Sequence, residues 1–267
     1  MRRSVPAIAL ATAALALPAS ATATAPATLH LTDGEQLVTN LALTAWPGQG
    51  AFNTYDADAP TGGVTRGMPG IATGWSNDTK CARLIDDLLS HSYTWATSTW
   101  FKAVFAGSTT PDTAKWLAAD LAAATHLEPV DTVAGVAAGD IVLLDKAGTG
   151  VDHTAVVRQV TALTGGLTPQ DGTVQYAVQV LDSTSNPHGW LINGTSHPYS
   201  DWADTRRLDG AGSSVTEYDG AGYGWMVLYA NVSDGKAYGW RWGVNESDIS
   251  RISDGHGVKF ARVTDAA

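Results

Sequence analysis

The amino-acid sequence predicts an α+β fold, with helices in the first half of the chain and antiparallel strands in the second. Apolar residues recur at helical spacing up to about residue 125, whereas short apolar runs bounded by Gly and Asp follow from residue 139 onward. Helices and strands do not alternate in the second half, so a parallel sheet with crossover helices is not expected. The chain is therefore predicted to form one domain in which helices pack on an antiparallel sheet.

Three segments have the pattern of helices. Apolar residues recur every four positions within 34–45, and those of 81–89 lie on one helical face. Residues 77–79, Asn-Asp-Thr, are of the types that cap helix N-termini, so the second helix is expected to begin at residue 81. A third helix is predicted from 111 to about 125, because the proline at its start suits the first turn of a helix.

The second half of the chain predicts a series of strands joined by turns. Residues 141–145 and 153–160 are separated by a short turn and are expected to pair as an antiparallel hairpin. A third strand, 176–181, follows a glycine-rich turn and ends at Asp182. Further strands are predicted at 226–230, 237–242 and 258–263.

Residues 1–25 have the pattern of a secretory signal. Two arginines follow Met1, an apolar run rich in Ala and Leu extends from Val5 to Leu17, and small residues follow it. The apolar run is too short to span a bilayer. Cleavage is compatible with three positions, after Ala21, Ala23 or Ala25. The mature chain, residues 26–267, is therefore expected to be secreted, outside the cell or in the cell envelope, without a membrane anchor.

Removal of the signal leaves an acidic chain with one cysteine. Without Arg2 and Arg3, 14 of the 16 basic side chains remain against 26 acidic ones, a formal charge of −12. Such a charge disfavours nucleic acid and anionic lipid as partners. Because a single thiol cannot form an internal disulfide, Cys81 is either an inert buried residue, an intermolecular bridge or a reactive group.

Three residues are predicted to form a catalytic site around that thiol: Cys81, His153 and Asp182. Cys81 lies in the first turn of a predicted helix, where unpaired N–H groups and the helix dipole lower the pKa of a thiol. If strands 153–160 and 176–181 pair, the start of one lies beside the end of the other, which brings His153 next to Asp182. A thiolate nucleophile, a histidine base and a carboxylate that orients the histidine are the parts of a cysteine hydrolase.

Each of these residues also has an ordinary structural interpretation. A lone cysteine is often buried and inert, a histidine at a strand start is often a surface or cap residue, and Asp182 precedes Ser-Thr-Ser-Asn-Pro, which is typical of a turn. His188, on the loop after the same strand, is an alternative third catalytic residue. A metal site made of His153, Asp182 and His188 is a further alternative, but this spacing matches no familiar ligand pattern, and no metal or cofactor is expected.

Four short motifs follow one another along the chain. They are Asn-Asp-Thr-Lys-Cys-Ala-Arg-Leu-Ile at 77–85, Gly-Asp-Ile-Val-Leu-Leu-Asp at 139–145, Asp-His-Thr-Ala-Val-Val at 152–157 and Val-Leu-Asp-Ser-Thr at 180–184. This order resembles the NlpC/P60 superfamily of papain-like cysteine peptidases. In that family the nucleophile begins a helix, a Gly-Asp pair begins the first core strand, the base histidine begins the next strand, and a polar residue ends the third.

The resemblance implies a papain-like core over residues 75–185, with an N-terminal segment before it and a β-rich C-terminal extension over 186–267. It also implies hydrolysis of amide bonds in bacterial cell-wall peptides, typically next to D-isoglutamate, without a metal or organic cofactor. The chain departs from the family at two places. Residues 80–83 read Lys-Cys-Ala-Arg instead of the usual Asp-Cys-Ser-Gly, and Asp182 stands where many members have histidine.

The predicted function is amide hydrolysis outside the cell through an acyl-enzyme, with a peptide or a peptidoglycan stem peptide as substrate. The backbone N–H of Cys81 is the expected first donor of the oxyanion hole. The second donor is left open among Asn77, Trp75 and Tyr55. A non-catalytic wall-binding module on the same fold, with its thiol buried, is the alternative function.

Overall fold

The computed structural model describes residues 26–44, 52–56, 62–71, 73–147, 152–164, 167–192, 202–209, 215–244 and 246–265. The predicted secretory signal, residues 1–25, lies outside these ranges. None of the helices formed by the described residues has the length and apolar character needed to cross a membrane.

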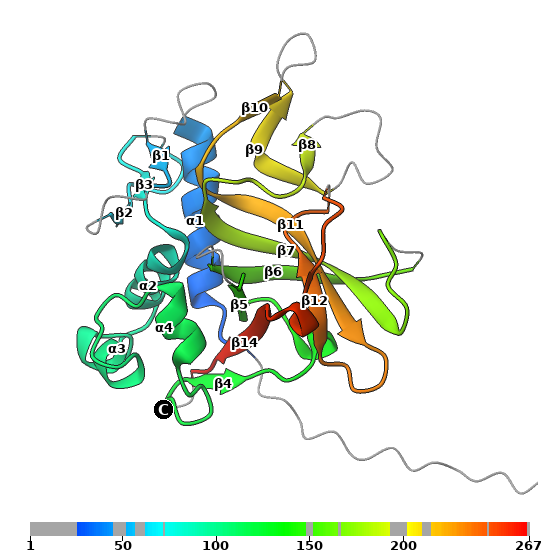
Figure 1. Ribbon diagram of the computed structural model, residues 1–267. Coiled ribbons are helices and arrows are strands. Elements are labelled where there is room, and N and C mark those ends of the chain that lie inside the picture. The colour runs from blue at the N-terminus through cyan, green and yellow to red at the C-terminus, as the bar shows by residue number, and fades with distance from the viewer. Residues whose placement is uncertain are drawn as a thin grey trace, which may run out of the picture.

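A large antiparallel sheet dominates the molecule (Figure 1). Its eight strands lie in the order β13-β12-β11-β7-β6-β5-β14-β4, and every neighbouring pair is antiparallel. In chain order the strands are β4 (Leu127–Pro129), β5 (Ile141–Asp145), β6 (His153–Leu163), β7 (Thr173–Thr184), β11 (Gly220–Asn231), β12 (Ala237–Arg241), β13 (Ser250–Arg251) and β14 (Gly257–Val263). The predicted hairpin 141–145/153–160 and the strand that follows it are therefore confirmed as β5, β6 and β7.

Two small three-stranded sheets lie beside the large one. The first joins β1 (Asn53–Thr54), β3 (Ser76–Asp78) and β2 (Val64–Thr65). The second joins β10 (Val215–Glu217), β9 (Ala203–Asp209) and β8 (Trp190–Ile192), and it lies above the large sheet in Figure 1. Both matter for the site below, because β3 leads directly into the cysteine-bearing helix and β9 contacts β11.

The described residues form four α-helices, gathered on one side of the molecule in Figure 1. They are α1 (Leu29–Thr44), α2 (Cys81–Ser92), α3 (Ser98–Val104) and α4 (Thr113–Ala118), and two 3₁₀ turns, η2 (Val133–Gly135) and η3 (Ile252–Asp254), occur among the strands. The helix predicted at residue 81 begins there. Its predicted caps are wrong, because the N-cap residue is Lys80, which makes no side-chain cap bond.

The predicted third helix is much shorter than expected. α4 begins after Asp112, whose carboxylate accepts from the backbone N–H of Lys115, and it ends at Ala118. Beyond that point the Asp120 carboxylate accepts from the backbone N–H groups of Ala122 and Ala123. Such local bonds hold the backbone in a turn that competes with the helix.

The predicted fold class, an α+β protein with a papain-like core, is wrong: the protein is mostly β. Strands β11 to β14, which were expected in an extension packed on the core, join the same sheet as β5, β6 and β7 on both of its sides. β7 and β11 are each twelve residues long and pair along their whole length. Against this sheet the four helices are few, and two of them have seven residues or fewer.

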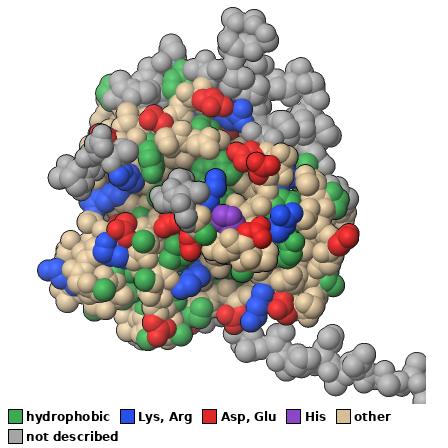
Figure 2. All heavy atoms as spheres, in the orientation of Figure 1, with side chains coloured by type: hydrophobic (Ala, Val, Ile, Leu, Met, Phe, Trp, Pro, Cys, Tyr) green, Lys and Arg blue, Asp and Glu red, His purple; other side chains and the backbone are tan. Residues whose placement is uncertain are grey.

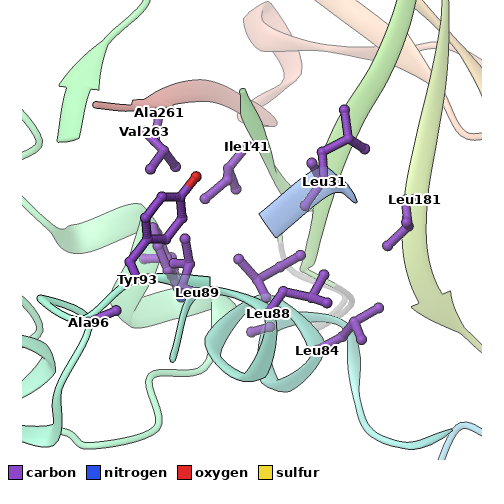
Figure 3. Close-up of a cluster of buried hydrophobic side chains, with 14 of the residues drawn as sticks. Leu31, Leu84, Leu88, Leu89, Tyr93, Ala96, Ile141, Leu181, Ala261 and Val263 are labelled. Carbon is purple, nitrogen blue, oxygen red and sulfur yellow. The ribbon is translucent and has the colours of Figure 1, made fainter. Parts of the chain in front are cut away.

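Alternation along the strands gives the sheet two apolar faces. Ile141, Leu143, Val156 and Leu181 pack in one cluster with residues of the helices. Figure 3 shows Leu84, Leu88 and Leu89 of α2 beneath Ile141 and Leu181. The intervening residues of the same strands pack on the opposite face in a second cluster. Because both faces are buried, these strands appear in sequence as continuous apolar runs. The first cluster fixes α2 against β6 and β7, and with it the position of Cys81.

The second cluster shows that the sheet is curved. It contains Trp240 of β12 and Phe260 of β14, strands that four others separate in the sheet order, and β12 also contacts β14 directly. A flat sheet would hold these strands far apart, since neighbouring strands lie about 4.8 Å from each other. On the face of the molecule that Figure 2 shows, acidic and basic side chains are interspersed and form no large patch of a single charge.

Candidate active site

The fold brings the three predicted catalytic residues to one end of the large sheet. Cys81 is the first residue of α2, and His153 is the first residue of β6. Asp182 lies near the end of β7, one residue beyond Leu181, which pairs with Val156. The Nε2 atom of His153 lies 2.6 Å from the Oδ2 atom of Asp182. The expected proximity of His153 and Asp182 thus follows from the antiparallel register.

The thiol of Cys81 lies at a cleft of about 480 Å³. Its side chain is 6% exposed, and its sulfur lies 3.5 Å from the hydroxyl of Thr113 and 4.0 Å from the backbone carbonyl of Asp152. Residues from α2, from α4 and the segment before it, and from the loop before β6 form the walls, and Tyr55 completes them. The only cysteine of the chain therefore lines a cleft large enough for part of a ligand.

Cys81 and His153 shift each other's ionisation. Burial raises the pKa of the Cys81 thiol, but hydrogen bonding to His153 and its charge outweigh burial and bring the pKa down to about 7. Burial lowers the pKa of His153, but hydrogen bonds to Asp182 and Cys81 raise it to about 9. Both shifts favour a thiolate beside an imidazolium. A thiolate is the nucleophilic form of cysteine.

Asp182 is a buried member of strand β7 with three charged or polar neighbours. Its Oδ2 atom accepts from Nε2 of His153 and, at 2.9 Å, from Nε2 of His188, while its Oδ1 atom accepts from Arg206 at 2.9 Å. Burial raises the pKa of Asp182, but the charges of Arg206 and His188 hold it well below its usual range. The interpretation of Asp182 as a residue that opens a turn is therefore wrong, because its carboxylate is bound inside the protein.

Sequence reasoning missed the ion pair behind Asp182. Arg206 of β9 is fully buried, and two of its nitrogens bond to the carboxylate of Asp204 at 2.9 Å each. The same carboxylate accepts from the backbone N–H of His188 at 2.8 Å. Asp204 and Arg206 are two positions apart in a strand, so their side chains lie on the same face. This spacing of opposite charges is the one feature of the sequence that could have indicated the ion pair.

His188 and Trp242 complete the surroundings of the histidine. His188 is fully buried, and the indole of Trp242 lies 4.8 Å from its ring and 4.7 Å from the ring of His153. The indole N–H donates to the backbone carbonyl of Asn186 at 2.8 Å, which fixes the indole. His188, the predicted alternative to Asp182, is thus in the site. It bonds to the carboxylate of Asp182, whereas His153 is the histidine that interacts with the thiol.

The structure separates the three candidates for the second oxyanion donor. The indole N–H of Trp75 donates to the carbonyl of Met68, and the amide of Asn77 donates to Asn53 and the carbonyl of Thr54. Both are therefore engaged elsewhere. Tyr55 lines the cleft, and burial together with the charge of Cys81 and a hydrogen bond to it raises the pKa of its hydroxyl. Tyr55 is thus the candidate that faces the sulfur.

The His153, Asp182 and His188 group brings three potential metal-ligand atoms within 4.8 Å of one another. A metal-bound histidine donates its other ring N–H to an acceptor. The Nδ1 atom of His188 is buried without such a partner, and Arg206 already places a positive charge on the carboxylate. These surroundings suit two N–H donors on a carboxylate and do not fit a divalent cation.

Comparison with known proteins gives no relative from which a role for these residues can be taken: no family model, curated protein or solved structure matches the chain.

Proposed function

We propose that the protein is a cysteine hydrolase in which Cys81 is the nucleophile, His153 the general base and Asp182 the residue that orients the base. The observation that carries the proposal is the linkage of all three through one imidazole. Its Nε2 atom bonds to Asp182 at 2.6 Å, and its interaction with Cys81 lowers the pKa of the thiol to about 7. With Nε2 on the carboxylate, Nδ1 is the nitrogen left to exchange a proton with sulfur.

The proposed reaction has two steps. The Cys81 thiolate attacks the carbonyl carbon of an amide, and the backbone N–H of Cys81 and the Tyr55 hydroxyl donate to the oxyanion. Imidazolium of His153 then gives its proton to the leaving amine as the C–N bond breaks, which leaves a thioester. His153 next takes a proton from water, whose oxygen attacks the thioester, and the C–S bond breaks to release the acid.

The substrate class that we propose is a peptide amide, and within it the stem peptides of bacterial cell walls. Two features support this choice. The cleft at the thiol is about 480 Å³, enough for a few side chains of an extended peptide. The motifs around Cys81, His153 and Asp182 resemble those of NlpC/P60 peptidases, and the N-terminal pattern of a secretory signal would deliver the mature chain to the envelope or the medium.

Purified muropeptides incubated with the mature protein and analysed by mass spectrometry test both parts of the proposal. New fragments that gain one water identify hydrolysis and the bond that is cut. The control is Cys81→Ala, which removes the nucleophile and has little effect on packing. Equal cleavage by the folded Cys81→Ala protein would refute the mechanism, and cleavage of simple peptides but not of muropeptides would refute the assignment of stem peptides as substrate.

The alternative function, a non-catalytic wall-binding module, is favoured by one observation, the 6% exposure of the Cys81 side chain. Alkylation by iodoacetamide near pH 7 distinguishes the two functions, because a thiolate reacts quickly whereas an inert buried thiol does not. Slow alkylation together with tight binding to intact wall would support the module.

A further inference from the structure

We propose that Thr113 is a further catalytic residue, whose hydroxyl donates to the Cys81 sulfur and holds it as the thiolate. This inference rests on the proposed function, since it concerns the same nucleophile. Thr113 Oγ1 lies 3.5 Å from the sulfur, within the range for a hydrogen bond that involves sulfur. Its side chain lines the cleft, so it touches the reacting atom from the side where a substrate would enter.

The position of Thr113 is fixed by its neighbours. It is the first residue of α4, and the preceding Asp112 accepts from the backbone N–H of Lys115 and so anchors the start of this short helix. Thr113 is 5% exposed. Its hydroxyl faces the thiol of Cys81, the first residue of α2, so the contact joins the starts of the two helices. A buried hydroxyl held in this way needs little reorganisation to remain beside the sulfur.

A second hydroxyl extends the hydrogen-bonded chain from Thr113. Thr154 Oγ1 lies 2.7 Å from Thr113 Oγ1, and Thr154 is fully buried beside His153 in β6. A thiolate has no proton to give, so Thr113 must donate to it. Thr113 can then accept the proton of Thr154, and both hydroxyl protons are directed toward the sulfur. Hydrogen bonds to a charged acceptor are stronger than those to a neutral one, so these two linked hydrogen bonds favour the thiolate over the neutral thiol.

Other groups that face the thiol can ionise, whereas the two threonines cannot. The imidazole of His153 in β6 and the hydroxyl of Tyr55, after β1, both interact with the thiol. Two carboxylates also lie near it: that of Asp86 in α2, and that of Asp152 in the loop whose backbone carbonyl contacts the sulfur. Thr113 therefore lowers the pKa of the Cys81 thiol by an amount that does not vary with pH, in addition to the larger effect of His153. This separates its contribution from a change in the protonation of a neighbour.

The test is the pH profile of Cys81 alkylation by iodoacetamide, together with the ultraviolet absorbance of the thiolate, for Thr113→Val and Thr113→Ser. Valine keeps the branched shape without the hydroxyl, and serine keeps the hydroxyl. We expect the midpoint of the Thr113→Val profile to rise by about one pH unit, which is about tenfold less thiolate at acidic pH. The alkylation rate there falls only about threefold, because a more basic thiolate is more nucleophilic. The Thr113→Ser midpoint should remain near wild type.

Thr154→Val gives an independent measurement, because it removes the second hydroxyl and leaves the hydrogen bond from the backbone of residue 154 to the sulfur in place. It should raise the midpoint by a smaller amount in the same direction, and it keeps the test open if Thr113→Val does not fold. An unchanged midpoint in Thr113→Val, or equal shifts for valine and serine, would overturn the inference. Because the assay needs no substrate, a shifted midpoint without muropeptide cleavage refutes the proposed hydrolysis of stem peptides while leaving the hydroxyl assignment in place.

Discussion

His153 and His188 donate to the same oxygen of Asp182, at 2.6 and 2.9 Å. The other oxygen of this carboxylate is held by Arg206. Three donors from β6, from the loop after β7 and from β9 therefore fix one buried side chain. In the proposed mechanism the imidazole of His153 can rotate little, because the carboxylate that orients it cannot turn without breaking a charged hydrogen bond on its far side.

Replacing Asp182 by Asn should reduce both activity and stability. The amide cannot stabilise imidazolium and can favour the wrong tautomer of His153, so we expect hydrolysis to fall roughly 10- to 10³-fold. Arg206 would also lose one of its two carboxylates. We expect a cost of about 2–3 kcal/mol in the free energy of unfolding, below the ~3–5 kcal/mol for a buried charge left wholly unpaired. Urea unfolding and turnover per folded molecule measure the two effects separately.

Asp204→Asn is the matched control for that experiment. It removes the other carboxylate of Arg206 and leaves the bond between His153 and Asp182 untouched. The stability loss should be similar, whereas turnover per folded molecule should stay within about threefold of wild type. If both variants lose activity equally, Asp182 acts by holding the fold and not by orienting the base.

His153→Ala should be as damaging as Cys81→Ala, because members of a catalytic unit do not contribute additively. His188→Ala should be mild in turnover, within about tenfold. It should still lower the free energy of unfolding by about 1–3 kcal/mol, because the removed ring is fully buried and bonded to Asp182. A reversed order of activities would transfer the role of base from His153 to His188.

Local patterns were sufficient to predict that the residues of the candidate site lie close together. The start of the α2 helix at Cys81 follows from apolar spacing, and the hairpin of β5 and β6 follows from two apolar runs and a short turn. Once β7 pairs with β6, the proximity of His153 and Asp182 is a matter of register. Each of these inferences uses segments that are neighbours along the chain.

Partners that are distant along the chain could not be predicted. Arg206 reaches Asp182 from β9, 24 residues later, and Trp242 directly follows β12. The fold class failed for the same reason, because single-strand patterns do not say that β11 pairs with β7 along its whole length. Pairing over such separations depends on the summed burial of both faces of the sheet, which no short motif records.

Trp242→Ala should weaken the proposed catalysis without removing any reacting group. The indole lies against both His153 and His188, and its loss would admit water to the hydrogen bond between His153 and Asp182. Water screens that bond, so we expect turnover to fall about tenfold. Trp242→Phe is the control, since it keeps a ring over the histidines and loses only the indole N–H donated to Asn186. Equal turnover in wild type and Trp242→Ala would show that the ring does not shield the bond.

The free energy of unfolding should decline as the pH is lowered from 6.5 to 4, because of His30. Its ring is fully buried; the Tyr93 hydroxyl lies 2.9 Å from Nδ1, and Nε2 lies 2.8 Å from the carbonyl of Gly139. The Tyr93 oxygen already accepts from the backbone N–H of Leu29, which leaves its proton for Nδ1. This arrangement satisfies a neutral ring, and burial lowers the pKa of His30 from 6.5 to about 4.

The sign of the His30 effect follows from the proton balance. Above pH 6.5 the ring is neutral in both states, and its full contribution is present. As pH falls below 6.5 the unfolded chain takes up a proton that the folded chain refuses, so stability declines until about pH 4 and then levels off. At ~1.4 kcal/mol per pKa unit the whole decline is roughly 3–4 kcal/mol. Urea unfolding at several pH values should show this decline in wild type and a flatter profile in His30→Gln, which starts from a lower stability at pH 7. Parallel profiles for the two proteins would assign the acid sensitivity to other groups.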